Sequence, residues 1–322
     1  MSNAVFLTGG TGFLGHALLQ RLSTTDERPL IATARLSKPH FPTSVKLEHV
    51  GELGKDTDWT ACLRGVEIVI HCAARAHAMN DKTGDPLAEY RRVNVQGTLA
   101  LARQSAKVGV RRFVYISSIK VNGERTEANT AFQANDIPAP EDAYGISKLE
   151  AEQGLMVLAR GTGMEVVIIR PPLVYGPGVK GNFVSMVRWV SKGVPLPLGA
   201  VHNKRSLVAL ENLVDFIVLC ADPERSPRAA NEVFLISDGE DVSTTELLRK
   251  VATAYHVRPR LLPIPASLIQ TVARLLGKGA VADRLLGTLV VDSSKAQDLL
   301  GWRPVISMDE QLKKMVLHDT RI

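Results

Sequence analysis

Thr8-Gly9-Gly10-Thr11-Gly12-Phe13-Leu14-Gly15 follows the apolar run Ala4–Thr8 and precedes a stretch with helical periodicity. In that context the glycine spacing predicts a strand, a tight turn and a helix that together bind a dinucleotide. Gly9 permits the turn, Gly12 lets the backbone approach a pyrophosphate, and Gly15 lets the helix pack closely on the strand. The phosphates would then lie on free N–H groups at the positive end of the helix.

Further apolar, β-branched runs alternate with helical patterns, which is typical of a parallel sheet covered by helices. Together with Val233–Ser237, expected as a returning strand, the candidate strands are Ala4–Thr8, Leu30–Ala34, Val45–Val50, Ile68–His71, Arg112–Ser117 and Glu165–Arg170. We therefore predict an α/β fold with a Rossmann-type doubly wound parallel sheet.

A smaller substrate-binding cap domain is expected after Arg170, where prolines 171, 172, 177, 195 and 197 interrupt the alternation. The predicted division gives residues 1–170 and about 205–240 to the nucleotide-binding domain, and 171–204 and 241–322 to the cap. Within the cap, Ala266–Val291 has Leu, Val and Arg at helical spacing. A cap helix packed by one face on the core is favoured there over a membrane-surface helix.

Tyr144-Gly-Ile-Ser-Lys148 is the second informative stretch. If residues 143–160 are helical, the phenol and the ammonium lie one turn apart on one face. Ser118 would end a strand at the same crevice, beyond the carboxyl ends of the sheet. Taken with the glycine run, this set resembles the extended short-chain dehydrogenases/reductases, the NAD-dependent epimerase/dehydratase family, from about Val5 to about Pro304.

The resemblance implies three catalytic roles. Ser118 hydrogen-bonds the substrate oxygen, Tyr144 donates or accepts its proton, and Lys148 holds the cofactor ribose and lowers the pKa of Tyr144. Bringing a tyrosine pKa from about 10 to about 7 needs roughly 4 kcal/mol. One ammonium at about 7 Å supplies roughly 2.4 kcal/mol at an effective dielectric of ~20, so the positive charge of an oxidised nicotinamide is needed as well.

The remaining cofactor contacts follow from the same resemblance. Arg35 stands where NAD-binding relatives carry an acid, and an Arg can bond a 2′-phosphate, so NADP(H) is favoured over NAD(H). Stacking of Arg35 on adenine would suit either cofactor. His71 is expected to be a hydrogen-bonded strand-end residue, not a catalyst. The other predicted contacts, besides the glycines, Tyr144 and Lys148, are Phe13, Leu14, Ala73, Ala74, Asn94 and Pro171.

A UDP-linked sugar is the expected substrate. Arg205 resembles the Arg that nucleotide-sugar enzymes of this family place on the diphosphate, and a planar guanidinium suits that group. Asn182 matches the start of their cap helix, and Arg75, His77 and Lys120 are expected beside the sugar. Sugar 4,6-dehydratases carry Asp-Glu where this chain has Ile119 and Lys120, which disfavours elimination of water.

The amino-acid sequence around these motifs is most similar to that of bacterial UDP-4-keto-6-deoxy-N-acetylhexosamine 4-reductases. The expected reaction is therefore NAD(P)H-dependent reduction of that 4-keto group in surface polysaccharide biosynthesis. A UDP-hexose or UDP-N-acetylhexosamine 4-epimerase with tightly bound NAD is the first alternative. A reductase of apolar carbonyls and a non-catalytic NAD(P)-sensing binding protein are further alternatives.

Composition limits the partners and the compartment. The chain has 322 residues and a net charge of +6, but its cations are scattered and no nucleic-acid module is present. Cys62, Cys72 and Cys220 have neither paired nor metal-ligand spacing, so neither disulfide nor metal is expected. We expect a cytoplasmic protein without membrane insertion. By analogy with the family, the helical stretches Leu87–Lys107 and Ala143–Arg160 are expected to form a homodimer interface.

Overall fold

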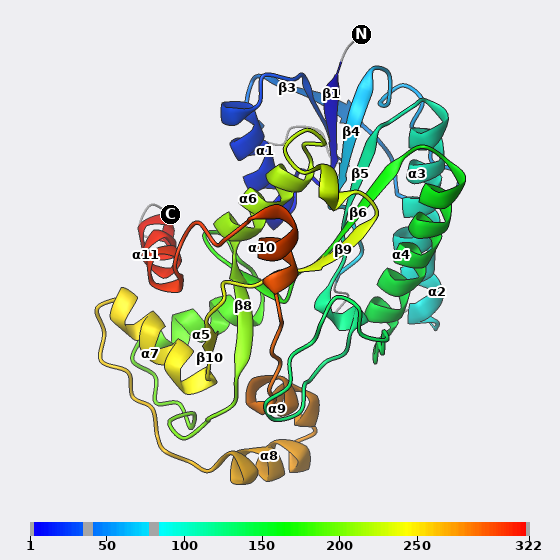
Figure 1. Cartoon of the computed structure of the whole chain (residues 1–322). Coiled ribbons are helices and arrows are strands. Elements are labelled where there is room, and N and C mark those ends of the chain that lie inside the picture. The colour runs from blue at the N-terminus through cyan, green and yellow to red at the C-terminus, as the bar shows by residue number, and fades with distance from the viewer. Residues whose placement is uncertain (1–2, 35–40, 77–83, 320–322) are drawn as a thin grey trace.

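The computed structural model describes residues 3–34, 41–76 and 84–319, and a seven-stranded sheet lies at its centre (Figure 1). The strand order is β3-β2-β1-β4-β5-β6-β9, and every neighbouring pair is parallel. This confirms the predicted doubly wound sheet, with strand ends that differ from the expected ones by one or two residues. The strands are β1 (Ala4–Thr8), β2 (Leu30–Ala34), β3 (Val45–His49), β4 (Val66–His71), β5 (Arg112–Ile116), β6 (Glu165–Arg170) and β9 (Glu232–Leu235).

Helices cover both faces of this sheet, so its central strands are apolar on both sides. In β1, Val5 and Leu7 enter the core under α1 (Phe13–Thr25) and α6 (Leu210–Cys220). Phe6 enters a separate core on the other face of the sheet, under a second layer of helices. That second layer consists of α2 (Pro86–Tyr90), the π-helical turn η1 (Arg91–Gly97), α3 (Thr98–Lys107) and α4 (Ala143–Gly161).

A smaller sheet with the strand order β10-β8-β7 forms a separate core with the cap helices. Its strand β8 falls in the range that we assigned to the nucleotide-binding domain, whereas α6 and β9 of that range pack with the main sheet. The domain boundaries themselves stay a prediction. The cap elements are β7 (Leu173–Tyr175), α5 (Asn182–Ser191), β8 (Arg205–Ala209), β10 (Asp241–Val242), α7 (Thr244–Ala254) and α11 (Met308–Asp319).

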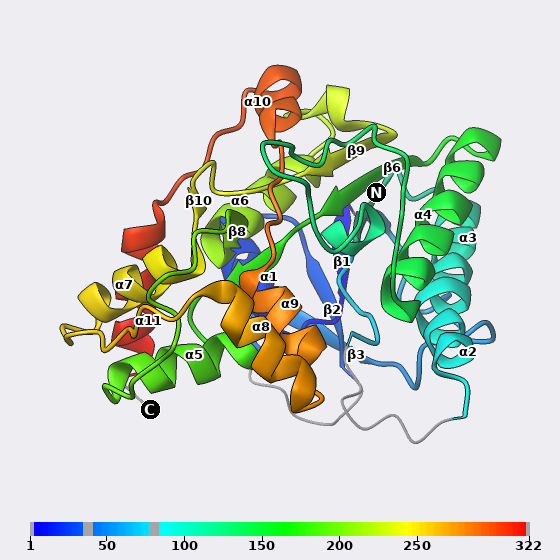
Figure 2. The same cartoon turned by 90° about the horizontal axis from the view of Figure 1, so that it is seen from below.

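The segment expected as one cap helix forms two, α8 (Ala266–Leu275) and α9 (Gly279–Leu286), at the end of the cap farthest from the N-terminus (Figures 1 and 2). Gly277 separates them with a φ of 68°, a left-handed conformation that suits glycine. Within the described ranges, no helix is long and apolar enough to cross a membrane. The remaining elements are the 3-10 turns η2 (Ile119–Val121) and η3 (Pro227–Ala229) and helix α10 (Ser294–Leu300).

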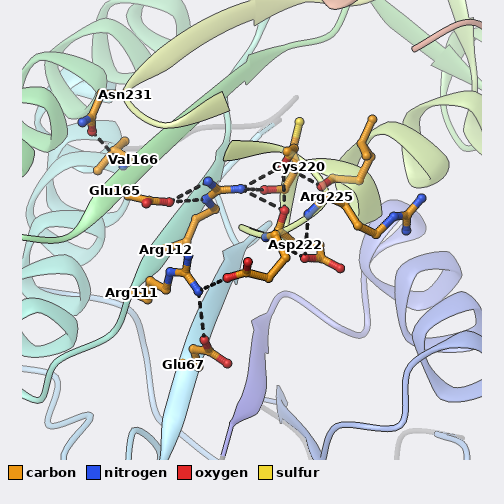
Figure 3. Close-up of polar contacts among 12 residues, drawn as sticks. Glu67, Arg111, Arg112, Glu165, Val166, Cys220, Asp222, Arg225 and Asn231 are labelled. Atoms are coloured by element: carbon orange, nitrogen blue, oxygen red, sulfur yellow. Dashed lines mark hydrogen bonds and ion pairs between the residues drawn. The ribbon is translucent and has the colours of Figure 1, made fainter. Parts of the chain in front are cut away.

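A buried arginine ties the amino ends of two central strands to α6 (Figure 3). Arg112 opens β5 and pairs with Glu165 of β6, with Nη2 at 2.6 Å from Oε2. Its Nη1 donates to the carbonyls of Cys220 and Asp222 at 3.0 and 3.2 Å and to Ser226 Oγ at 2.8 Å. The charge therefore satisfies carbonyls at the C-terminus of α6, as expected for a cation at a helix C-terminus.

Candidate active site

The loop between β1 and α1 has room for glycine and for nothing larger at two positions. Gly9 has a φ of 77°, and a Cβ there would lie 2.7 Å from the backbone nitrogen of Ala73. A Cβ on Gly15 would lie 2.1 Å from the carbonyl oxygen of Gly9, which no packing could accommodate. Gly12 N–H donates to the same oxygen at 2.9 Å and closes the turn.

This loop leads directly into the N-terminus of α1. Gly12 occupies the N-cap position, so no side chain covers the first-turn N–H groups. Phe13 and Leu14 are half-buried beside it. Free N–H groups at a positive helix end suit a pyrophosphate, and no side chain at Gly12 stands in the way of its approach. The residues present therefore fit the dinucleotide that the sequence predicts.

Tyr144 and Lys148 lie on the first turns of α4, which begins after the N-cap Asp142; the Asp142 side chain accepts from Gly145 N–H at 2.7 Å. Lys148 Nζ is 5.9 Å from the centre of the Tyr144 ring and donates to the Ile116 carbonyl at 2.6 Å. Because Ile116 ends β5, Ser118 stands two residues beyond the point where the ammonium binds. Lys148 therefore lies beside both Tyr144 and the end of β5, and Ser118 follows that strand end as the N-cap of η2.

The electrostatics of this pair depend on burial. Lys148 is only 2% exposed, and burial lowers its pKa to about 8. Its ammonium also lies 4.4 Å from the centre of the buried Tyr115 ring, a favourable cation–π distance. Burial raises the pKa of Tyr144, and the nearby Asp142 carboxylate acts in the same direction. Tyr144 is thus a protonated phenol at neutral pH until further positive charge enters the site.

Tyr90 contacts Tyr144 and was not predicted from the sequence. The two rings are 6.0 Å apart in an edge-to-face arrangement, and the Arg75 guanidinium lies 6.0 Å from the centre of the Tyr90 ring. Asn94 is buried and anchors this side: Oδ1 accepts from Arg75 N–H at 2.8 Å and Nδ2 donates to Ser147 Oγ at 3.0 Å. A tyrosine in an unremarkable helical stretch carries no local signal of such a contact.

The strand end below the site is held by hydroxyl groups. His71 Nδ1 and Nε2 lie 2.6 Å from Thr8 Oγ1 and 2.9 Å from Thr98 Oγ1, and burial lowers the pKa of His71 to about 3. His71 is thus a hydrogen-bonded residue at the end of β4, as expected, and its lack of a catalytic role stays a prediction. Ala73 and Ala74 follow it half-buried, and Ala73 N–H donates to Thr8 Oγ1 at 3.3 Å.

The predicted substrate residues are spread more widely than the catalytic ones. Lys120 Nζ pairs with Glu124 at 2.7 Å and with Asp142 at 2.5 Å, so its charge is held by two carboxylates. Arg205 Nη1 donates to the carbonyls of Arg284 and Gly287 at 2.6 and 3.1 Å, at the end of α9. Their contact with a substrate stays a prediction.

The other predicted contacts have simpler positions. Asn182 is exposed as the first residue of α5 in the cap. Pro171 is buried directly after the end of β6, and its carbonyl accepts from Ile119 N–H at 3.0 Å. Arg35 and His77 lie outside the described residues.

A parallel sheet with a glycine loop at a helix start defines a Rossmann-type dinucleotide-binding protein. The model of the NAD dependent epimerase/dehydratase family matches residues 5–236. A UDP-glucose 4-epimerase of Vibrio cholerae is 47% identical over 98% of this chain and 94% of its own length. The chain therefore belongs to the NAD dependent epimerase/dehydratase family, and the resemblance drawn from its motifs is confirmed.

Two more distant proteins are also similar to this chain. The GDP-6-deoxy-D-mannose reductase of Pseudomonas aeruginosa is 25% identical over 98% of this chain and 97% of its own length. The crystal structure of a UDP-glucose 4-epimerase of Thermotoga maritima with UDP-glucose has a TM-score of 0.75 and 24% identity, and the match covers 99% of each chain. At that identity the structural likeness shows the fold alone.

Proposed function

We propose that this enzyme is a UDP-sugar 4-epimerase with bound NAD. The observation that carries the proposal is the 47% identity to a UDP-glucose 4-epimerase over nearly both whole chains. This identity favours the epimerase, which was our first alternative, over the 4-keto reductase that the sequence around the motifs predicted. The preference for NADP(H) rested on Arg35 in the place of an acidic residue, and the family description names NAD. We therefore propose NAD(H) as the cofactor.

Bound NAD would supply the acceptor, and then the donor, of the hydride at C4 of the sugar. Tyr144 accepts the proton of the C4 hydroxyl as that hydride leaves, and it returns the proton when the hydride comes back on the opposite face. Ser118 hydrogen-bonds the same oxygen and holds it within reach of the phenol. The sugar loses and regains one hydride and one proton, so the net change is inversion at C4.

Burial makes this proton transfer depend on the state of the site. The pKa of Tyr144 is raised in the protein alone, and the Lys148 ammonium lies 5.9 Å from the centre of its ring. An oxidised nicotinamide beside the phenol adds a positive charge that favours the ionised form. The base is therefore generated only when NAD⁺ is bound, which couples removal of the proton to the presence of the hydride acceptor.

The test is turnover without added cofactor. Purified protein is incubated with UDP-glucose or UDP-N-acetylglucosamine, and the C4 epimer is followed by NMR. We expect conversion, and we expect Tyr144→Phe to lower kcat by about 10²–10⁴-fold, the usual contribution of a positioned acid–base group. Tyr255→Phe, whose hydroxyl bonds Asp319 in the cap, is the matched control and should keep its activity.

A second assay separates the epimerase from the alternatives. Stoichiometric consumption of NADPH or NADH with a UDP-4-keto-6-deoxy-N-acetylhexosamine, without epimerisation, would identify the reductase. Thermal stabilisation by UDP is expected for either nucleotide-sugar enzyme, and its absence would favour an apolar carbonyl substrate. Unchanged cellular function of Tyr144→Phe would favour the non-catalytic NAD(P)-sensing protein.

We also propose that the chain acts as a homodimer in the cytoplasm. The outer side of the α3–α4 layer leaves Val157 61% exposed and Val108 48% exposed. Such side chains suit a helical interface between two copies. A mass in solution equal to one chain would contradict the dimer.

A further inference from the structure

Helix α8 has two faces with different surroundings. Ala266, Ile269 and Ala273 are half-buried on one face, and Ile269 packs against the cap core. The neighbouring face carries an apolar stripe, defined here as Leu268, Val272 and Leu275 of α8 together with Leu276 at its C-cap. The exposed fractions of these side chains are 53%, 45%, 83% and 68% in that order. Their spacing of i, i+4, i+7 and i+8 is that of a single helix face.

The structure accounts for how α8 is attached but not for what covers its stripe. In α8, which is described throughout, no residue is buried. Gln270 Nε2 donates to Asp283 Oδ1 of α9 at 2.7 Å, which fixes the inner face. Figures 1 and 2 place the helix at the outer end of the cap, away from the central sheet. A contiguous exposed apolar stripe of this kind marks an interaction surface.

The charge around the stripe indicates the partner. Residues 256–291 contain five cations against one acid, Asp283, which is a net +4 out of +6 for the whole chain. Arg274 in the last turn of α8 and Lys278 just after the helix are both exposed, and Arg274 Nη2 lies 4.0 Å from Asp283 Oδ1. A second copy of the chain would bring an equally cationic surface, so self-association through α8 would be opposed by repulsion. Anionic phospholipid headgroups have the complementary charge.

We propose that α8 docks the cap on an anionic membrane surface. The apolar stripe enters the headgroup region, and the cations bind lipid phosphates from the ends of their long side chains. Ten residues span about 15 Å at ~1.5 Å per residue, about half of the ~30 Å hydrocarbon core. The helix therefore lies in the interface and does not cross the bilayer. This inference does not depend on the identity of the substrate.

Docking through α8 would orient the whole cap. α8 is bonded to α9 through Gln270, and Arg205 donates to the carbonyls of Arg284 and Gly287 at the end of α9. The predicted diphosphate residue is thus separated from the membrane surface by one helix. An enzyme held in this way would work at the level of the lipid headgroups.

Co-sedimentation of the full chain with phospholipid vesicles tests the proposal. We expect the wild type to bind phosphatidylcholine vesicles that contain phosphatidylglycerol at low salt, to bind pure phosphatidylcholine at least tenfold more weakly, and to be released by high salt. Leu275→Ser with Leu276→Ser should lower the partition coefficient at least about tenfold because the inserted apolar area is lost. Arg274→Gln with Lys278→Gln should lower it by about tenfold or more and flatten the salt dependence.

Ile137→Ser is the matched control because Ile137 is 89% exposed but lies in the loop before α4, outside the cap helices. Its binding should equal that of the wild type. All variants should keep the wild-type melting temperature and turnover of UDP-sugar, which shows that they fold. Failure of the wild type to bind anionic vesicles, or equal binding by the Leu275/Leu276 variant, would overturn the proposal. A change in the mass of that variant in solution would identify α8 as a contact between copies and would overturn it too.

Discussion

At the scale of single residues, burial of the Lys148 ammonium lowers the stability of the fold while placing a cation beside Tyr144. This buried ammonium donates to the neutral Ile116 carbonyl, and burial lowers its pKa from 10.5 to about 8. The folded protein therefore releases this proton at a lower pH than the unfolded chain does. Between these two values the unfolded state binds more protons, so Lys148 makes stability rise with pH in that window.

Replacing Lys148 by Met tests this effect of burial. Holding the charge below pH 8 costs about 3 kcal/mol, since each unit of pKa shift corresponds to about 1.4 kcal/mol. Urea unfolding is measured from pH 7 to 10.5 for the wild type and Lys148→Met. We expect the wild type to gain about 3 kcal/mol over the variant across this range, while the variant has no epimerase activity. Parallel stability curves would show that Lys148 is not desolvated.

Gly15 permits a second prediction at this scale. A Cβ at this position would lie 2.1 Å from the Gly9 carbonyl oxygen, so Gly15→Ala must move the start of α1 away from β1. We expect NAD affinity to fall at least tenfold in a calorimetric titration, because the N–H groups no longer converge on the pyrophosphate. Gly163→Ala is the matched control, since a Cβ there meets open space. Equal loss in both variants would contradict the steric argument.

The sequence predicts those site residues whose signal is local. Tyr144 and Lys148 are four positions apart on one helix, so their spacing alone brings them together, and Ser118 comes just after a predicted strand, which places it at the carboxyl end of the sheet. Tyr90 and Tyr115 meet these groups only through packing between separate elements, for which one sequence contains no pattern. The structure shows the Lys120 ammonium between two acidic side chains, which no local pattern predicted, and its expected place beside the sugar stays a prediction.

At the scale of elements, α4 is fixed to the sheet by a buried ion pair. Arg170 of β6 and Glu152 of α4 are 5% and 4% exposed, with Nη2 at 2.6 Å from Oε2. Glu152 also accepts the hydroxyl proton of Ser117, and Arg170 Nη1 donates to Asn122 Oδ1 at 2.9 Å. Glu152 is one turn beyond Lys148, so this network sets where the catalytic helix lies relative to the end of β5.

Breaking one side of this pair should be costly. Arg170→Met leaves the Glu152 carboxylate buried without its partner, and we expect a loss of about 3–5 kcal/mol in urea unfolding. Adding Glu152→Leu should recover a large part of that loss because no unpaired charge remains. Lys314→Met, which breaks the exposed pair with Glu211, is the control and should cost less than about 1 kcal/mol. A double variant no better than the single one would contradict this account.

Element prediction succeeded where a segment is long or strongly apolar. The main strands are buried on both faces and read as continuous runs of Val, Ile and Phe. β7 and β10 contain three and two residues and are too short to show any period. The segment 266–291 reads as a single helix because its composition is uniform, and only the conformation of Gly277 divides it.

At the scale of the whole molecule, the two ends of the main sheet have different tasks. The carboxyl ends carry the glycine loop, Ser118 and the contact between Lys148 and Ile116. The amino ends carry the Arg112 network, in which one guanidinium binds β6 and the end of α6 (Figure 3). One five-residue strand, β5, therefore bears a structural cation at its start and the support of the catalytic cation at its end.

This division predicts that stability and catalysis are separable by position along β5. Arg112→Met removes the donor for two carbonyls and a hydroxyl around α6 and leaves Glu165 without its ion pair. We expect a loss of about 3 kcal/mol, since buried acceptors left unbonded cost roughly 1–3 kcal/mol each and Glu165 is partly solvated. The neighbouring Arg111→Met breaks only contacts with Glu67 and Glu224 at the surface and should cost less than about 1 kcal/mol.

Below the unfolding transition, KM and kcat of both variants should equal those of the wild type, because neither side chain touches the carboxyl end of the sheet. A fall in kcat of Arg112→Met under fully folded conditions would show that the amino end also positions Ser118 and Lys148.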